Sequence, residues 1–357
     1  MIDLFEGFFG GKKVLITGHT GFKGSWLCVW LHQLGAEVIG VGLDPYSEKD
    51  IFVSSGVGEK MKDFRVDIRD IKALRKVFVD CQPEIVFHLA AQPLVRLSYE
   101  EPVLTYETNV LGTINVLEAI RETDSVRVGV MITTDKCYEN REDGRAYKET
   151  DPMGGYDPYS SSKGAAEIAI SSWRRSFMNP ETYDTHHKSI ASVRAGNVIG
   201  GGDWAKDRII PDCIRSIENN QPIPIRNREA VRPWQYVLEP LRGYMMLAMK
   251  MWNFPTDYCE GWNFGPRMDA VVNVWNVAEM LIREYGEGSL MDKTDPNAVH
   301  EAKLLMLDNT KAAQRLGWVP KLSVEQCVSL TVDWYVKYRH QDVYSLCVEE
   351  IEKYCKI

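Results

Sequence analysis

The chain has 357 residues, of which 45% are apolar and 26% are charged, and this balance is typical of a folded globular protein rather than a disordered one. Its 50 acidic and 42 basic side chains give a net charge of −8, which argues against nucleic acid as a partner because a polyphosphate attracts proteins of opposite charge. At roughly 150 residues per domain, the length predicts about two domains.

Residue spacing excludes several other classes of protein. The eight cysteines contain no C-x-x-C pair and are expected to be reduced thiols. The seven histidines form no ligand grouping, and the adjacent His186 and His187 are interpreted as a solvated loop pair, so no metal is expected. The first residues are acidic before they are apolar, and no apolar run approaches the ~20 residues that span a bilayer. We therefore expect a cytoplasmic protein without a signal peptide or a membrane partner.

Short apolar runs alternate with longer helical patterns along the first two thirds of the chain, which predicts repeated βαβ units. Strands are expected at 12–17, 36–44, 64–67, 83–91, 126–134 and 189–198, and helices at 25–34, 71–81, 103–123 and 159–177. After residue 200 prolines become frequent and the pattern less regular, up to a late amphipathic helix within 318–339. The fold class is therefore α/β, with a doubly wound parallel sheet and a smaller second domain. Such sheets bind ligands beyond the carboxyl ends of their strands.

A glycine-rich segment, TGHTGFKG, lies between the first expected strand and the first expected helix. Its glycines, Gly18, Gly21 and Gly24, permit a tight turn and let backbone N–H groups approach a pyrophosphate at the helix N-terminus. A purely structural turn would also use glycines, but Asp44 ends the next strand and favours dinucleotide binding. Its carboxylate can accept from ribose hydroxyls and would repel the 2′-phosphate of NADP. The segment predicts NAD as the cofactor.

Tyr159 forms a Tyr-x-x-x-Lys pair with Lys163, and on a helix this spacing places both side chains on one face. An ammonium about 4 Å from a phenol, at an effective dielectric near 20, favours the phenolate by about 4 kcal/mol, or roughly three pKa units. For an isolated pair, a surface contact would be the simpler interpretation. Because this pair follows the dinucleotide motif and the Thr133-Thr134 strand end, we predict that Tyr159 acts as a base near neutral pH.

The chain resembles the extended short-chain dehydrogenase/reductases that act on nucleotide sugars. The shared segments, in the family's order, are TGxxGFxG, HLAAQ (88–92), ETNVLGT (107–113), TTD (133–135), YSSSK (159–163) and RAGNVIG (194–200). The resemblance implies an NAD-binding Rossmann domain, formed by 1–198 and roughly 235–258, and a sugar-nucleotide-binding domain, formed by roughly 199–234 and 259–357. It also implies that the tyrosine removes a C4 hydroxyl proton while hydride passes to NAD, assisted by Thr134 and by Lys163, which orders the nicotinamide ribose.

Longer strings at 18–27, 133–138, 196–212 and 231–241 resemble the branch of this family that acts on CDP-glucose. The resemblance implies a 4,6-dehydration, in which oxidation at C4 is followed by loss of water between C5 and C6 and by return of hydride to C6. The 4-keto-6-deoxy product would enter deoxysugar biosynthesis for O-antigen lipopolysaccharide. An acid/base pair beside C5 and C6 is needed for this elimination, and the chain offers Asp135 and Lys136 where dTDP-glucose enzymes have Asp-Glu.

Lys136 leaves two mechanisms open, because an ammonium with an ordinary pKa near about 10.4 cannot accept a proton. In the first, a neutral Lys136 is the C5 base and Asp135 is the C6 acid. In the second, a charged Lys136 stabilises the developing enolate, and proton transfer is left to Asp135 or Tyr159. The alternative to both is an ion pair in a loop without a chemical role.

The resemblance implies further contacts to NAD and to the substrate. Those to NAD come from Thr20, Phe22, Lys23, Asp67, Ile68, Leu89, Ala90, Ala91, Thr108 and Thr133, and those to the sugar nucleotide from Gln92, Ser98, Thr134, Arg194, Asn197, Arg208 and Arg232. Asn197 and Arg232 match pyrophosphate-binding positions of the family, and a guanidinium suits bidentate contact with phosphate. For Arg194, at a strand end, a purely structural brace is the alternative.

The resemblance also implies a homo-oligomer, in which the apolar helical faces at 103–123 and 159–177 form a four-helix interface. The apolar segment 244–252 is interpreted as a core or interface helix face. Two rival functions remain at this point. One is another enzyme of this fold, either a 4-epimerase or a dTDP- or GDP-sugar dehydratase. The other is a catalytically inactive NAD-sensing regulator, which would have no reason to keep Thr134, Asp135, Tyr159 and Lys163 together.

Overall fold

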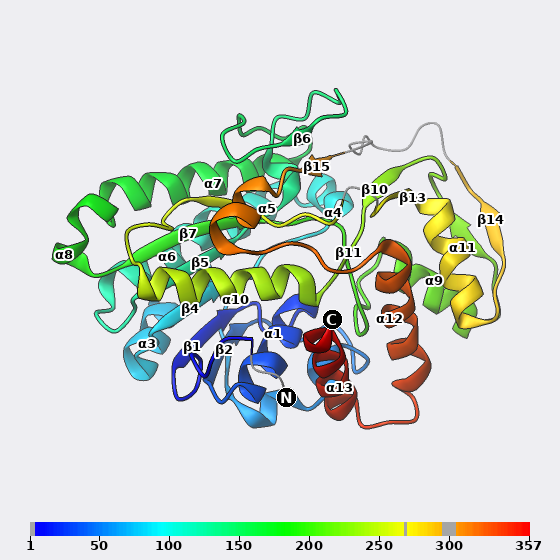
Figure 1. Cartoon of the computed structure of the whole chain (residues 1–357), viewed down its shortest axis with the longest axis horizontal. Coiled ribbons are helices and arrows are strands. Elements are labelled where there is room, and N and C mark those ends of the chain that lie inside the picture. Colours follow the sequence, from blue (N-terminus) through cyan, green and yellow to red (C-terminus); the bar gives the residue numbers. More distant parts are fainter. Residues whose placement is uncertain (1–3, 268–269, 295–304) are drawn as a thin grey trace.

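Seven parallel strands form the central sheet of the structure, a computed structural model that describes residues 4–267, 270–294 and 305–357 (Figure 1). The strand order is β12-β7-β5-β4-β1-β2-β3, and the doubly wound α/β fold expected from the sequence is confirmed. The bounds are β1 Lys13–Thr17, β2 Glu37–Gly42, β3 Lys62–Arg65, β4 Ile85–His88, β5 Val128–Ile132, β7 Ser189–Arg194 and β12 Gly261–Asn263. Five of the expected strands contain β1, β2, β4, β5 and β7, whereas β3 begins two residues before the strand expected at 64–67 and overlaps it.

Helices cover both faces of this sheet, because successive residues of a strand point to opposite sides. On β1, Val14 and Ile16 join the core beneath α1 and α10, while Leu15 joins the core beneath α3, α6 and α7. The bounds are α1 Phe22–Gln33, α3 Ile71–Cys81, α6 Gly112–Glu122, α7 Pro158–Ser176 and α10 Leu238–Asn253. The apolar segment 244–252 belongs to α10 and is largely core.

The helix expected at 103–123 is interrupted by one wider turn. The chain runs through α5 (Pro102–Tyr106) into a π-helical turn, η2 (Glu107–Leu111), and then into α6. Such turns are frequent at functional sites. The neighbouring helix α7 begins at Pro158, where the Asp157 side chain accepts a hydrogen bond from the Ser160 backbone N–H, and this cap fixes the position of Tyr159.

Most of the remaining elements lie beyond the carboxyl ends of the strands or against α1 (Figure 1). The helices are α2 Ile51–Ser54, α4 Val95–Glu100, α8 Tyr183–His186, α9 Ile209–Glu218, α11 Val274–Tyr285, α12 Val324–Lys337 and α13 Val343–Lys356. The short 3-10 turns are η1 Val57–Lys60, η3 Asp135–Cys137 and η4 Pro180–Thr182, and η6 Ala312–Leu316 is π-helical. Two-stranded pairs are β6 Ala146–Tyr147 with β15 Met306–Leu307, β8 Val198–Ile199 with β11 Gln235–Tyr236, β9 Ile223–Ile225 with β14 Leu290–Asp292, and β10 Val231–Pro233 with β13 Val271–Asn273.

Several elements were not foreseen from the sequence, and two of them, β12 and α13, pack directly against elements that were. Strand β12 joins the sheet beside β7 although its residues lie in the segment expected to form the second domain, and α13 packs against α1 and α12. The division of the chain into two domains stays a prediction. The late amphipathic helix is α12, and it begins with a capping box formed by Ser323 and Gln326.

The described part of the chain contains no helix that is both long and apolar enough to span a bilayer. All eight cysteines are buried, and none of them forms a disulfide.

Close packing joins the segment after β8 to α12. A Cβ added at Gly201 would lie 2.0 Å from Cγ of the Trp334 ring, and the Gly201 carbonyl accepts from the Trp26 indole at 2.9 Å. We predict that Gly201→Ala lowers the free energy of unfolding by about 1 to 3 kcal/mol, the usual cost of overpacking a core. Thermal unfolding followed by circular dichroism measures this loss. An unchanged melting temperature would contradict the packing described.

Candidate active site

The glycine-rich turn lies where the strand order of the sheet reverses, between β1 and β4. Gly18 has a φ of +73°, and a Cβ there would lie 2.6 Å from the Ala90 backbone nitrogen. A Cβ at Gly24 would lie 2.1 Å from the Gly18 carbonyl oxygen. The turn therefore brings Leu89 and Ala90, after β4, against the start of α1, as expected at the ligand-binding crevice of a doubly wound sheet.

The residues expected to hold the adenosine lie along the ends of β2 and β3. Asp44 is largely exposed, and its carboxylate lies 3.6 Å from the Arg65 guanidinium. Thr20 donates to the Leu43 carbonyl at 2.9 Å. Asp67 is engaged by Arg69, whose side chain holds the Asp67 pKa below its usual value. Ile68 is buried, and its side chain packs against the backbone of Gly112 at the start of α6.

Tyr159 and Thr134 meet across the junction of α7 and the end of β5. The Thr134 hydroxyl lies within hydrogen-bonding distance of the Tyr159 hydroxyl and of the Asp135 carboxylate, at 2.9 Å, and its single proton can be donated to one of them at a time. Ser98, on α4, accepts from the Tyr159 backbone N–H at 3.1 Å while donating to the Val95 carbonyl. Ser98 therefore fixes the first turn of α7. Its hydroxyl proton is used in a hydrogen bond within the protein.

The expected lowering of the Tyr159 pKa is not present in this structure. Burial raises the pKa of Tyr159 to about 12, opposed by the hydrogen bond from Thr134 and by the charge of Arg208. Lys163 is buried on the same face of α7, and burial lowers its pKa to about 8, opposed by Glu167. The attraction expected from Lys163 is outweighed because removing both groups from water disfavours the charged form of each.

Asp135 and Lys136 lie on the same side of the sheet as Tyr159, in the short turn η3 that packs against α7. Asp135 is 3% exposed and accepts from the Asn197 amide at 3.4 Å. A Cβ at Gly196 would lie 2.0 Å from the Asp135 carboxylate. Lys136 is half-buried, and its ammonium has no hydrogen bond or ion pair to any described residue. The acid is therefore tightly positioned and the lysine is not.

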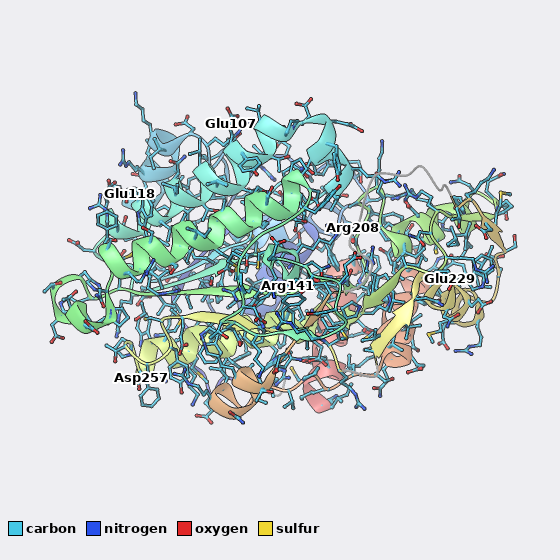
Figure 2. The ribbon with its side chains drawn as sticks, turned by 90° about the horizontal axis from the view of Figure 1, so that it is seen from above. Glu107, Glu118, Arg141, Arg208, Glu229 and Asp257 are labelled. Atoms are coloured by element: carbon cyan, nitrogen blue, oxygen red, sulfur yellow. The ribbon has the colours of Figure 1, made fainter. Side chains whose placement is uncertain are left out.

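Lys23 lies close to three charged side chains, those of Lys163, Arg208 and Asp135. Burial lowers the pKa of Lys23 to about 7, and the charges of Lys163 and Arg208 contribute to the lowering, while Asp135 opposes it. Arg208 is held by Asp203 at 2.8 Å and lies near the N-terminal end of α7 (Figure 2). An anion bound beside Lys23, Lys163 and Arg208 would offset their mutual repulsion, so this crevice is suited to an anion although the whole chain is acidic.

Five other residues were also predicted to contact NAD or the substrate. Both ends of the Gln92 amide are bonded within the protein, to Thr105 and to the Leu94 backbone, so Gln92 holds the loop after β4. Thr108 is half-buried in the π-helical turn. Arg232 lies on β10 and donates to the Val231 carbonyl. Phe22 and Ala91 flank the crevice and are partly buried.

Arg194 lies in a buried brace. Its guanidinium binds the Glu167 carboxylate at 2.8 Å and also donates to the Tyr138 hydroxyl. Thr133 donates to the same Glu167. The sequence interpretation did not single out Glu167, although it follows Lys163 by four residues and so lies on the same helix face. It also missed Tyr244 of α10, whose buried hydroxyl has no partner among the described residues and whose pKa Asp135 raises beyond the effect of burial.

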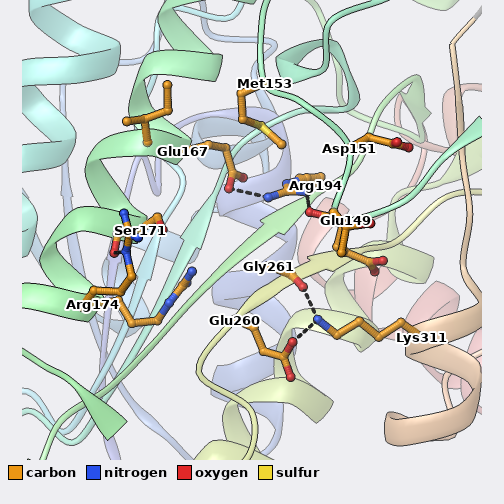
Figure 3. Close-up of a pocket in the computed structure, with 13 residues that line it drawn as sticks. Glu149, Asp151, Met153, Glu167, Ser171, Arg174, Arg194, Glu260, Gly261 and Lys311 are labelled. Atoms are coloured by element: carbon orange, nitrogen blue, oxygen red, sulfur yellow. Dashed lines mark hydrogen bonds and ion pairs between the residues drawn. The ribbon is translucent and has the colours of Figure 1, made fainter.

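A separate charged cavity of about 390 Å³ lies on the other side of this brace (Figure 3). Its lining includes Arg174, Glu260 and Lys311, but not Tyr159, Thr134 or Asp135. Lys311 binds Glu260 and the Gly261 carbonyl. Lys311 is therefore paired within the protein, whereas a buried nitrogen of the Arg174 guanidinium has no hydrogen-bond partner among the described residues. In the described ranges no three His, Cys, Asp or Glu side chains gather as a metal site would require.

Comparison with known proteins places the chain in a family. A family model described as GDP-mannose 4,6 dehydratase matches residues 15–331. A CDP-glucose 4,6-dehydratase of Salmonella typhimurium is 47% identical over 355 residues, which cover 99% of this chain and 98% of that protein. A dTDP-glucose 4,6-dehydratase of Escherichia coli is 26% identical over 354 residues, which cover 91% of this chain and 92% of that protein.

Solved structures share the same fold. A UDP-glucose 4-epimerase of Thermus thermophilus in complex with NAD superposes with a TM-score of 0.77 at 26% identity, covering 92% of this chain and 99% of its own. A dTDP-glucose 4,6-dehydratase of Streptomyces venezuelae with NAD bound superposes with a TM-score of 0.78 at 22% identity. This match covers 91% of this chain and 97% of the solved chain. Together with the match over residues 15–331 and the full-length relative at 47% identity, these findings confirm the resemblance found in the sequence: the chain belongs to the GDP-mannose 4,6 dehydratase family.

Proposed function

We propose that the protein converts CDP-glucose to CDP-4-keto-6-deoxyglucose and water, as an NAD-dependent 4,6-dehydratase. One observation carries this proposal beyond family membership. Asp135 and Lys136 follow the catalytic threonine directly and lie on the same side of the sheet as Tyr159. An epimerase needs an acid/base group at C4, whereas a dehydratase also needs groups that reach C5 and C6. The 47% identical relative, named for the CDP-glucose reaction, supports the choice of nucleotide.

The residues of the crevice fit NAD. The close approaches at Gly18 and Gly24 leave room for a pyrophosphate at the N-terminus of α1, where backbone N–H groups and the helix dipole favour an anion. Lys23 would add a buried positive charge there, and an anion would relieve the repulsion that lowers its pKa. Asp44 would hold the adenosine ribose. When bound, NAD supplies the hydride acceptor for C4, the hydride donor for C6 and a positive charge beside the phenol.

Tyr159 would take the C4 hydroxyl proton while Thr134 holds the same oxygen. The reaction needs the phenolate, which burial opposes and which Arg208 and the Thr134 hydroxyl favour. Asn197, Arg208 and Arg232 would hold the diphosphate of the substrate, because amide and guanidinium donors suit phosphate oxygens. At C5 and C6, both mechanisms for Lys136 remain: a neutral base beside an acidic Asp135, or a cation that stabilises the enolate. The Lys136 side-chain nitrogen has no partner among the described residues, so it is available as a neutral base in the first mechanism or as an ammonium in the second.

Substrate choice gives the first test. We expect the purified protein to generate the 4-keto product from CDP-glucose, seen as ultraviolet absorbance that develops in base, and to give far less from dTDP-glucose, GDP-mannose or UDP-glucose. A 4-epimerase gives no such absorbance with any of them, and an NAD-sensing regulator turns over none. Comparable turnover of a second nucleotide sugar would contradict the assignment of CDP-glucose.

Exchange at C5 separates the two roles of Lys136. We predict that Lys136→Met lowers kcat by at least about 100-fold, the usual contribution of a positioned acid/base or electrostatic group. In deuterium oxide, retained exchange of solvent deuterium into C5 would rule out Lys136 as the sole base, and lost exchange would support that role. Lys72→Met, at an exposed lysine of α3 outside the proposed site, serves as the control. Unchanged kcat in Lys136→Met would leave the residue without a chemical role.

We also propose a homo-oligomer formed through α5, η2, α6 and α7. Apolar side chains are exposed on adjacent parts of these helices, with Val103 70%, Leu111 55% and Ile168 61% exposed, and a groove of about 420 Å³ lined by 102–111 runs beside them. Exposed apolar surface of this kind marks association sites. The eight unpaired thiols support a location in the cytoplasm. There the product would serve as a precursor for deoxysugars of O-antigen lipopolysaccharide.

A charge placed on this face should dissociate the oligomer. We predict that Leu111→Glu converts it to monomers, because a buried unpaired carboxylate is costly. Light scattering after gel filtration gives the mass directly. Val336→Glu, at a residue on α12 that is 46% exposed, is the matched control and should keep the mass of the wild type. An unchanged mass for Leu111→Glu would refute this interface.

A further inference from the structure

A buried carboxylate joins α7 to the sheet directly behind the proposed catalytic centre. Glu167 is 4% exposed and Arg194 is 5% exposed, and their charged groups lie 2.8 Å apart (Figure 3). Glu167 comes from α7 and Arg194 from the end of β7. Because neither group is solvated, each depends on the other to remain charged.

The same carboxylate also holds two strands. One oxygen accepts from the Thr133 hydroxyl at 2.5 Å, and the other accepts from the Ser192 hydroxyl at 2.7 Å. Thr133 follows β5 and immediately precedes Thr134. Burial raises the Glu167 pKa, but Arg194 and the hydroxyl donors outweigh it and leave the pKa below its usual value. Glu167 is therefore an ionised anchor that joins α7 to two strands.

Lys163 lies one helical turn before Glu167, on the same face of α7. The titratable groups that face Lys163 are Glu167 on α7, Lys23 on α1, His88 on β4 and Cys137 in η3. Burial lowers the His88 pKa to about 3 and raises the Cys137 pKa, so both are neutral near pH 7. Among these groups, Glu167 alone brings a negative charge, and it opposes the lowering of the Lys163 pKa.

We propose that Glu167 is a positioning residue for the dehydration: its carboxylate, held by Arg194, fixes the separation between the helix that carries Tyr159 and Lys163 and the strand end that carries Thr134, and keeps Lys163 charged. The proposal rests on the proposed function and deepens it. It assigns Arg194, expected to contact substrate, to the support of the site through Glu167. The charge and the hydrogen bonds of one side chain thus serve two different parts of the centre.

The test compares the pH dependence of kcat in Glu167→Gln with that of the wild type on CDP-glucose. Loss of the negative charge lowers the Lys163 pKa, so the activity that requires its ammonium is lost at a lower pH. We expect the alkaline limb to move down by about one pH unit or more, the effect of a unit charge at close range in a protein. A merely structural role would lower kcat equally at all pH values and leave the limb in place, which would overturn the proposal.

Two further variants keep the test decisive. Glu239→Gln is the matched control, because Glu239 is also a buried partner of an arginine, Arg242 at 3.5 Å, but lies by α12 and α13. It should lower stability without moving the limb, and an equal movement would overturn the proposal. Glu167→Asp keeps the negative charge but shortens the side chain. We expect kcat to fall at least about tenfold while the alkaline limb of the pH profile stays at the same pH. An unchanged kcat in a folded Glu167→Asp would contradict the positioning role. This result can be obtained even if Glu167→Gln does not fold.

A readout without turnover separates this proposal from the proposed function. In protein labelled with ¹³C-lysine, the Lys163 ε-carbon signal is identified by its loss in Lys163→Arg and then titrated. We expect its apparent pKa to be lower in Glu167→Gln than in the wild type, whatever the substrate, and equal values would overturn the proposal. If the wild type does not act on CDP-glucose while this shift is present, the substrate assignment fails and the electrostatic role of Glu167 stands.

Discussion

The packing of α7 against the end of β5 is the constraint on which the candidate site depends. A Cβ at Gly164 would lie 2.3 Å from the Gly154 carbonyl oxygen and 3.2 Å from that of Cys137, so the helix can approach the turn η3 this closely only because residue 164 is glycine. On either side of Gly164, Lys163 and Glu167 face the sheet. The same contact brings Tyr159 to Thr134, and it sets Asp135 beside both.

Burial then determines the electrostatics of this junction. It raises the pKa of Tyr159 to about 12 and lowers those of Lys163 and Lys23 to about 8 and about 7. Each of these groups is thus less readily charged than in water, and each regains charge when an opposite charge is brought to it. The crevice is in this sense prepared for an anionic cofactor and an anionic substrate, although the chain as a whole carries a net charge of −8. Local placement of a few cations outweighs the overall field.

Much of the fold and part of the site could be predicted from the sequence, because they depend on local patterns. Helix α3 was expected at its observed bounds, and β1, β2, β4, β5 and β7 each fell within an expected range, while β3 overlaps its expected range by two residues. Gly18, Gly24, Tyr159 and Asp135 lie together because each follows or precedes a regular element of a known kind of sheet. The positive φ of Gly18 agrees with its motif.

What could not be predicted depends on contacts between distant segments. Strand β12 has three residues and no alternation of its own, and it is recognisable only through its pairing with β7. The pKa of Tyr159 was expected to fall because Lys163 lies on the same helix face. The burial of both side chains, which has the opposite effect, comes from tertiary packing. Arg194 was assigned to substrate because its partner, Glu167, is distant in sequence. The spacing of Glu167 from Lys163 was a signal that could have suggested the partner.

The central claim is that one crevice above β5 holds the hexose with C4 at Tyr159 and with C5 and C6 beside Asp135 and Lys136. The most direct measurement is a crystal structure of Asp135→Asn with NAD and CDP-glucose. The account predicts the C4 hydroxyl within hydrogen-bonding distance of Tyr159 and Thr134, and the C6 hydroxyl beside residue 135. A hexose bound with C6 directed away from residues 135 and 136, or bound in the charged cavity behind Arg194, would contradict it.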